Sequence, residues 1–206
     1  MLEILFFIGL ILFSYLLGCF SAARLIAKTY RSLDIYKVGT GHPDTQNIYD
    51  NVDKALGIFT GVIDVGKIFF FLVLLNTLLH NSFLNEYLPF LSRIATKDHL
   101  LLIGFFMIIG HCFPITHHFR GGRGLFTYIG YITFFAPWPM FIMAFLALIL
   151  VIFFKQIRFA QYMIVLLPPF LNFFFEKDAA LLGKLFLAAI LLGIINYFVS
   201  KKLGEI

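Results

Sequence analysis

Long apolar stretches alternate with short polar segments along the whole chain. Three stretches reach the roughly 20 mostly apolar residues that a helix needs to cross a bilayer, at residues 4–27, 56–79 and 179–199. Shorter apolar runs are expected to be short or tilted spans or re-entrant pieces; they cover residues 100–115, 125–135, 139–154 and 161–175. The pattern predicts an all-α integral membrane protein with about seven transmembrane helices, several of them short, in one polytopic domain over residues 1–206.

The composition supports this interpretation and excludes an ordinary soluble domain. Hydrophobic residues make up 61% of the chain and charged residues only 13%, whereas about a quarter of a soluble domain is charged. The 28 phenylalanines are spread along the chain, so the apolar excess does not belong to a single anchor. The first apolar stretch is longer than the core of a signal peptide and has no small-residue cleavage site, so we expect it to remain as a span.

The cations between the apolar runs predict the orientation. With seven spans, one side of the membrane carries only Arg93, Lys97 and Lys177. The other side carries the ten remaining loop and terminal cations: Lys28, Arg31, Lys37, Lys54, Arg120, Arg123, Lys155, Arg158, Lys201 and Lys202. The positive-inside rule then predicts an outside N-terminus and a cytoplasmic C-terminus. The net charge of +5 is dispersed between spans in this way, so no nucleic-acid partner is expected.

A proline pair is expected to separate two of the short runs. Ala136-Pro137-Trp138-Pro139 is unsuited to the interior of a helix, because each proline removes a donor and biases the preceding residue away from helical geometry. The sequence therefore predicts a turn there, with Trp138 at the membrane interface.

The least lipid-like segment is residues 110–124, which ends in a glycine cluster before an apolar helix. Gly121, Gly122 and Gly124 would let backbone N–H groups approach an anion, and the following helix would present its positive dipole end. Arg120 and Arg123 add bidentate donors. The segment is a candidate phosphate site; the alternative is a tight cytoplasmic turn whose arginines only follow the positive-inside rule.

The first polar loop, residues 29–54, is a second candidate for function. It is longer than most structureless connections, and long loops are often functional; the alternative is a solvated connector. Its candidate phosphate-binding residues are Gly39, Thr40, Gly41, His42 and Asn47.

Charges inside the predicted spans mark a third group of candidates. Asp64 and Lys67 are three residues apart on one helical face, so we expect them to pair with each other or with the loops, in a structural or a catalytic role. His111 is a candidate general base, with a helix-end hydrogen bond as the alternative. His117 and His118 are adjacent, with no carboxylate at a metal-ligand offset, so no metal site is assigned.

These residues resemble a known family. Gly-His-x-Phe-Pro, followed after four residues by Phe-x-Gly-Gly-(Lys/Arg)-Gly, is similar to the acyl-phosphate-dependent glycerol-3-phosphate acyltransferases of bacteria, the PlsY type. The resemblance extends through Leu33-Asp34-Ile35, residues 37–41, Asn47, Asp64 and Lys67. It implies a multi-pass protein of the bacterial cytoplasmic membrane that transfers an acyl group from acyl phosphate to glycerol 3-phosphate, giving lysophosphatidic acid, with no metal, coenzyme A or other cofactor.

The chain departs from the family pattern at positions that the resemblance assigns to substrate. Tyr36 stands where the family has arginine, Arg123 where it has lysine, and Arg158 where it has serine. The family sequence Gly-Ser-Gly-Asn-x-Gly-x-Thr-Asn is replaced here by Gly39-Thr40-Gly41-His42-Pro43-Asp44-Thr45-Gln46-Asn47. Two hypotheses follow. The first is an acyltransferase with an altered site, for glycerol 3-phosphate or another phosphorylated acceptor, in which Arg120 and Arg123 hold phosphate and His111 or His42 moves protons.

The second hypothesis is a catalytically degenerate member, a pseudoenzyme, that serves as a membrane subunit or lipid-phosphate binder for a membrane-protein partner. A transporter is a weaker third, because the spans carry too few polar residues to line a pathway.

Overall fold

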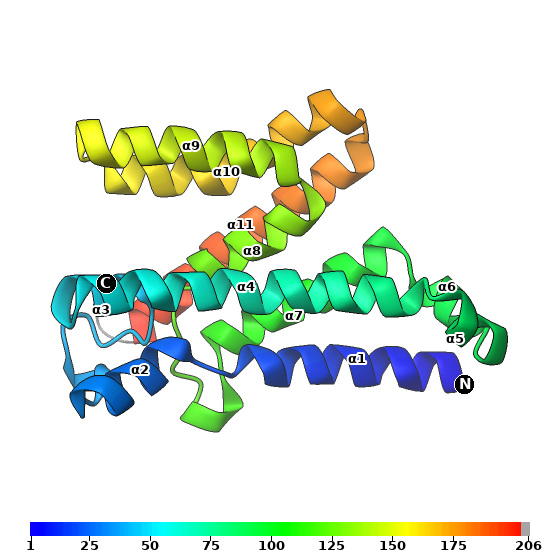
Figure 1. The fold of residues 1–206 in the computed structure, drawn as a ribbon, viewed down its shortest axis with the longest axis horizontal. Coiled ribbons are helices and arrows are strands. Elements are labelled where there is room, and N and C mark those ends of the chain that lie inside the picture. Colours follow the sequence, from blue (N-terminus) through cyan, green and yellow to red (C-terminus); the bar gives the residue numbers. More distant parts are fainter. Residues whose placement is uncertain (203–206) are drawn as a thin grey trace.

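The computed structural model describes residues 1–202 of the 206-residue chain, and this part contains helices and no strand. Figure 1 shows the helices as an elongated bundle, with the short helices gathered at its two ends. The elements in chain order are α1 (Leu2–Gly18), α2 (Ala22–Arg31), η1 (Ile35–Lys37), α3 (Thr45–Asn51), α4 (Lys54–Leu79), α5 (Ser82–Tyr87), α6 (Phe90–Ile94), α7 (Lys97–Cys112), η2 (Ile115–His117), α8 (Leu125–Phe135), α9 (Pro137–Phe154), α10 (Ile157–Glu176) and α11 (Ala179–Lys202).

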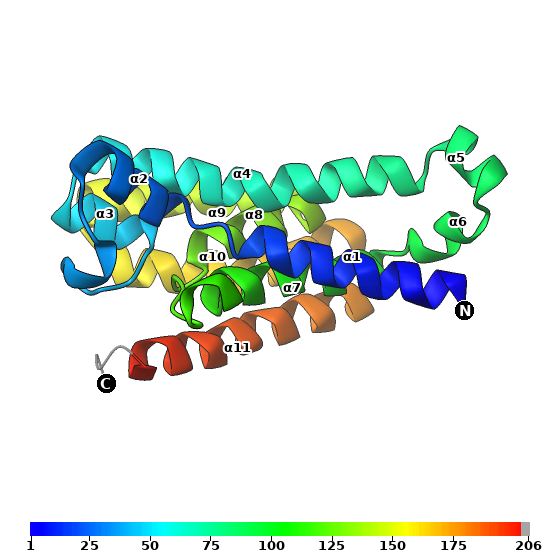
Figure 2. The same ribbon diagram turned by 90° about the horizontal axis from the view of Figure 1, so that it is seen from below.

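The helix lengths fit the predicted membrane class. In the part of the chain that the structure describes, six helical segments are long and apolar enough to cross a bilayer, and α8 is a shorter apolar helix of 11 residues. In Figure 1 the successive apolar helices α1, α4, α7, α8, α9, α10 and α11 alternate in direction along the long axis. The N-terminus and the end of α11 therefore lie at opposite ends of the bundle, as Figure 2 also shows. Which end faces the cytoplasm stays a prediction.

The first predicted span is divided in the structure. The sequence predicted one span over residues 4–27, but α1 ends at Gly18 and α2 begins at Ala22. Ser21 caps the new helix by accepting a hydrogen bond from the Arg24 N–H at 3.3 Å, which satisfies a donor at the start of α2. α2 is amphipathic: it buries Ala22, Ala23, Ile26 and Ala27 and carries Lys28 and Arg31 in its last turn.

The predicted turn around the proline pair is present but shorter than expected. α8 ends at Phe135 and α9 begins at Pro137, so only Ala136 separates them. Pro137 and Pro139 both lie in the first turn of α9. Backbone N–H groups in the first turn have no acceptor within the helix, so the absence of an N–H at proline costs no hydrogen bond there. Trp138 is exposed on the surface, as an interfacial tryptophan would be.

Small residues bring the long helices close enough to hold the site. Gly18 of α1 lies against the carbonyl of Met107, and Gly110 of α7 lies against the carbonyl of Tyr15, so these two helices meet backbone to backbone. Gly130 of α8 lies in the same way against the carbonyl of Val65 in α4. Any Cβ at these glycines would separate helices whose ends carry the polar groups described below.

The first loop is folded rather than extended. Residues 29–31 are the last turn of α2, and the loop then contains η1 and α3. A small apolar cluster of Ala23, Ala27, Ile35 and Ile48 holds these elements against each other, apart from the main core. The loop is therefore an ordered part of the structure that packs on its own small core.

Candidate functional site

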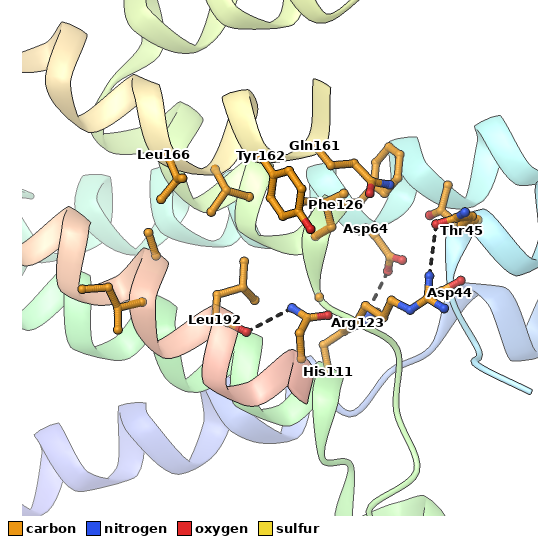
Figure 3. Close-up of a pocket in the computed structure, with 18 residues that line it drawn as sticks. Asp44, Thr45, Asp64, His111, Arg123, Phe126, Gln161, Tyr162, Leu166 and Leu192 are labelled. Atoms are coloured by element: carbon orange, nitrogen blue, oxygen red, sulfur yellow. Dashed lines mark hydrogen bonds and ion pairs between the residues drawn. The ribbon is translucent and has the colours of Figure 1, made fainter. Parts of the chain in front are cut away.

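A cavity of about 520 Å³ lies where α4, α7, α8, α10 and α11 meet the folded first loop (Figure 3). We call it the main cavity. One part of its wall is polar and consists of Asp44, Thr45, Gln46, Asp64, His111, Arg123, Gln161, Tyr162 and Asn196. The rest of its wall is formed by Gly124, Leu125, Phe126, Val165, Leu166, Ala189, Ile190, Leu192 and Gly193. A pocket with a polar head and an apolar tail suits an amphiphilic ligand.

Lys67 stands at the centre of the polar contacts beside the main cavity. Its Nζ donates to Asp64 Oδ1 at 2.8 Å and to the Phe20 carbonyl at 3.2 Å, and it lies 2.8 Å from His111 Nδ1. The predicted Asp64–Lys67 ion pair is therefore confirmed; Asp64 is only 1% exposed, and the side chain of Lys67 is 12% exposed. Because the Asp64 charge is removed from water, it depends on Lys67 for stabilisation.

The contact with Lys67 determines how His111 can act. An ammonium group has three donors and no acceptor, so His111 Nδ1 must accept from Lys67. A neutral His111 then carries its proton on Nε2. A Cβ placed on Gly122 would lie 2.7 Å from that Nε2, so the nitrogen faces the glycine segment. The N–H of this neutral imidazole therefore lies beside Gly122, while the His111 side chain forms part of the wall of the main cavity.

Arg123 is held by two residues that replace the family pattern in the first loop. Its Nη1 donates to Gln46 Oε1 at 3.1 Å, and its Nε lies 3.9 Å from Asp44 Oδ2 (Figure 3). Asp44 also caps α3 by accepting from the Asn47 N–H at 2.9 Å. Burial raises the pKa of the Asp44 carboxyl, while the Asn47 N–H, Arg123 and His42 act in the opposite direction. Ionisation of Asp44 at this buried position therefore costs free energy.

The start of α8 supplies backbone donors to the same end of the cavity. Gly124 precedes the helix with φ of 76°, a left-handed conformation that favours glycine, and no side chain caps the first turn. Gly124, Leu125 and Phe126 line the main cavity. The free N–H groups of this first turn and the helix dipole favour an anion at this position.

The other predicted phosphate residues lie outside the cavity wall. Asn47 donates from Nδ2 to the carbonyls of Val38 and His42, both at 2.9 Å, and its Oδ1 accepts from the Thr40 N–H at 3.3 Å. It therefore shapes the turn that contains Gly39 and Gly41. None of the predicted loop residues Gly39, Thr40, Gly41, His42 and Asn47 lines the main cavity.

The arginine and glycine residues before Arg123 are placed differently from it. Arg120 is exposed and does not line the main cavity; its carbonyl accepts a hydrogen bond from the Tyr36 hydroxyl at 2.9 Å. Gly121 and Gly122 are buried against the end of α7, where a Cβ on Gly121 would meet the His111 carbonyl. They are needed for the close approach of the loop, and only Arg123 and Gly124 reach the wall.

Sequence reasoning missed several polar residues of the wall. Asp44, Thr45 and Gln46 lie in a loop segment of which only Gly39, Thr40, Gly41, His42 and Asn47 were singled out. Gln161 and Asn196 are isolated amides in apolar helices, and that isolation was the available signal. Among residues 1–202 no group of three His, Cys, Asp or Glu side chains could hold a metal ion.

The family is decided by comparison with known sequences. The profile of the family described as glycerol-3-phosphate acyltransferase matches residues 8–203, nearly the whole chain. The chain belongs to the glycerol-3-phosphate acyltransferase family. This conclusion agrees with the segment from Gly110 to Gly124, which ends at the cavity wall.

Relatives within the acyltransferase family differ in how much of their length is matched. The glycerol-3-phosphate acyltransferase of Mycoplasma mobile is 31% identical over 133 residues, covering 64% of this chain and 52% of that protein. The enzyme of the same name from Nitrosospira multiformis is 28% identical over 185 residues, covering 90% and 86%. The match thus spans about half the length of some curated relatives and most of the length of others.

A solved structure shows the same fold. PlsY, an integral membrane glycerol 3-phosphate acyltransferase crystallised in its glycerol 3-phosphate form, superimposes with a TM-score of 0.73. The two chains are 19% identical, and the match covers 95% of this chain and 88% of PlsY. The polytopic membrane fold is therefore that of the acyltransferase family.

Proposed function

We propose that this protein is a membrane acyltransferase of phospholipid synthesis, which transfers an acyl group from acyl phosphate to glycerol 3-phosphate or a related phosphorylated acceptor. The observation that carries the proposal is the main cavity, in which a polar head that contains Arg123 and His111 adjoins an apolar tail. An acyl phosphate has the same division, with an anionic group at one end and a hydrocarbon chain at the other. The family relationship and the PlsY-like fold support the same reaction.

The polar head offers a place for the phosphate. The first turn of α8 presents free backbone N–H groups, and Arg123 adds a planar guanidinium that can bind two phosphate oxygens. The acyl chain would then lie between α10 and α11, along residues such as Leu166 and Ile190. Burial of that chain contributes about 0.8 kcal/mol per CH₂, which favours long acyl groups.

The transfer joins the acceptor oxygen to the acyl carbon. The acceptor hydroxyl attacks the carbonyl, and the bond from the acyl carbon to the phosphate oxygen breaks. The phosphate leaves with the electron pair of that bond and takes up the proton of the hydroxyl, so that it departs as hydrogen phosphate. Negative charge develops on the carbonyl oxygen during the attack. Because Lys67 occupies His111 Nδ1, the Nε2–H of His111 would be the group that donates to such an oxygen. We therefore assign His111 a donor role in preference to that of a general base.

The subunit hypothesis is less well supported than the enzyme. An amphiphilic cavity with an arginine, an imidazole donor and a helix N-terminus at one end retains the parts that acyl transfer requires. The partners implied are the lipid bilayer and a phosphorylated substrate.

The experiment is acyl transfer from palmitoyl phosphate to radiolabelled glycerol 3-phosphate by the purified protein. We expect lysophosphatidic acid from the wild type, and a loss of roughly a hundredfold or more in Arg123→Ala, since a charged donor to developing or transferred charge is removed. Arg93→Ala is the matched control, because Arg93 is an exposed arginine that lies 3.5 Å from Glu3 and does not line the main cavity. Equal activity of Arg123→Ala and Arg93→Ala would refute the assignment of the site.

Substitution of His111 tests its role within the same assay. The side-chain nitrogen of Gln can take the place of Nε2, whereas that of Asn lies near the position of Nδ1, so His111→Gln should keep more activity than His111→Asn. An equally large loss in both variants would favour a general base, because neither amide can accept a proton near neutral pH. Absence of product from the wild type, beside an active family member, would overturn the proposed reaction, and a panel of other phosphorylated acceptors would then be tested.

A further inference from the structure

A second cavity of about 740 Å³ lies beside α2 and shares no lining residue with the main cavity. We call it the α2 cavity. It is formed by α2, the chain on either side of it and the η2 turn, and its lining includes Phe20, Arg24, Leu25, Lys28, Asp34 and His117. Its Phe20 carbonyl accepts a hydrogen bond from Lys67, which also contacts His111 of the main cavity. The two cavities are therefore neighbours on either side of Lys67.

Arg24 is the residue in this cavity whose state calls for an explanation. Its Nη1 is shielded from solvent and has no hydrogen-bond partner within residues 1–202. No carboxylate in that part of the chain forms an ion pair with Arg24. A buried guanidinium N–H without an acceptor costs free energy, and natural proteins keep such groups chiefly where a ligand, ion or water completes them.

The other charges of the cavity leave it favourable to an anion. Lys28 adds a second cation one turn further along α2. Asp34 is the acid of the lining, but it already caps η1 through the Tyr36 N–H at 3.2 Å and lies 3.7 Å from Lys37. His117 contacts the hydroxyl of Thr116 at 2.6 Å. Two cations thus face one acid whose charge is partly balanced elsewhere.

The rim of the cavity indicates where the anion comes from. Phe20 and Leu25, which line the cavity, are 48% and 52% exposed, and Leu33 is also exposed. α2 itself segregates its buried apolar face from its cations, as helices at a membrane surface do. Apolar residues around a cationic centre suit a phosphate group that stands at the membrane–water interface.

We propose that the α2 cavity is a second phosphate-binding site, in which Arg24 and Lys28 bind the phosphate of a lipid headgroup or of a soluble phosphate monoester. The ligand would supply oxygen acceptors to the guanidinium of Arg24, and the apolar rim would contact the glycerol or acyl part of a lipid. This site is distinct from the main cavity and does not require that acyl transfer occurs.

The test measures binding in the purified full-length protein carrying Arg123→Ala, so that phosphate binding in the main cavity is weakened. Phosphatidic acid and phosphatidylcholine of the same chain length are compared by native mass spectrometry, and glycerol 3-phosphate and inorganic phosphate by calorimetry. Arg24→Gln should weaken phosphate-dependent binding about tenfold or more, the value of a charged hydrogen bond. Arg31→Gln is the control on the same helix, because Arg31 pairs with Asp53 at 2.7 Å and does not line the cavity.

The outcomes separate the sources of phosphate and decide the proposal. Arg24-dependent binding of phosphatidic acid alone would assign a lipid headgroup, and Arg24-dependent binding of glycerol 3-phosphate would assign a soluble monoester. The proposal would be overturned if Arg24→Gln and Arg31→Gln bound these ligands equally. It would also be overturned if the protein bound phosphatidic acid no better than phosphatidylcholine and bound no soluble phosphate. If thermal unfolding shows that Arg24→Gln is not folded, Lys28→Gln is tested in its place, and it should likewise weaken phosphate-dependent binding.

Discussion

Replacement of Lys67 by Met tests whether the buried contacts around it stabilise the bundle. Lys67 donates to Asp64, approaches His111 Nδ1 and donates to the Phe20 carbonyl, at 2.8, 2.8 and 3.2 Å. Met fills a similar volume but leaves the 1%-exposed Asp64 without its counter-charge. Removal of one partner of a buried ion pair costs about 3–5 kcal/mol, so we expect Lys67→Met to be destabilised by that amount.

The companion variants show whether the cost comes from the orphaned charge. Lys97→Met is the matched control, because Lys97 pairs with Glu176 at 2.9 Å on the surface, where such pairs contribute about 0–1 kcal/mol. The double variant Asp64→Leu with Lys67→Met should be more stable than Lys67→Met alone, since no charge remains buried without a partner. Equilibrium unfolding in mixed micelles with SDS measures all of them. A loss in Lys67→Met no larger than in Lys97→Met would refute the reasoning.

Two further predictions concern Asp44 and His111, which line the main cavity. Asp44→Asn keeps the cap of α3 but removes an acid whose pKa is raised by burial. Because the folded state favours the neutral acid, the stability of the wild type should fall relative to that of the variant as pH rises above about 4. If the melting temperatures of the two proteins change in parallel with pH, this prediction is contradicted. Gly122→Ala places a Cβ 2.7 Å from His111 Nε2 and should reduce acyl transfer at least tenfold. Gly183→Ala, where a Cβ meets nothing within 4 Å, should keep full activity, and equal loss in both variants would count against the close approach at Gly122.

The apolar pattern predicted the membrane helices well because the bilayer imposes the same requirement on every span. An uninterrupted apolar run must form a helix in lipid, where each backbone N–H and C=O needs an internal partner. The run over residues 4–27 misled this reasoning, since α1 stops at Gly18 inside it. The break between α1 and α2 is explained by local packing: the Gly18 backbone contacts the Met107 carbonyl, and Ser21 caps the start of α2.

The candidate site was predicted in part. His111, Arg123, Gly124 and Asp64 do line one cavity, and Lys67 contacts two of them. The loop residues around Asn47 were grouped with them by sequence pattern, but the structure shows that Asn47 directs its side chain into its own turn. A pattern of polar and glycine residues does not distinguish a loop that binds a ligand from a loop whose polar side chains form hydrogen bonds within the loop.

The sequence by itself determined the membrane class, the approximate number of helices and the family, because these depend on run lengths, composition and a short motif that are local in the chain. Only the tertiary structure decided which polar residues share a wall. Asp44, Asp64, Arg123 and Asn196 come from four separate segments, and their meeting depends on how closely glycines let those helices approach. The same packing created the α2 cavity, where the buried Nη1 of Arg24 has no signature in the sequence.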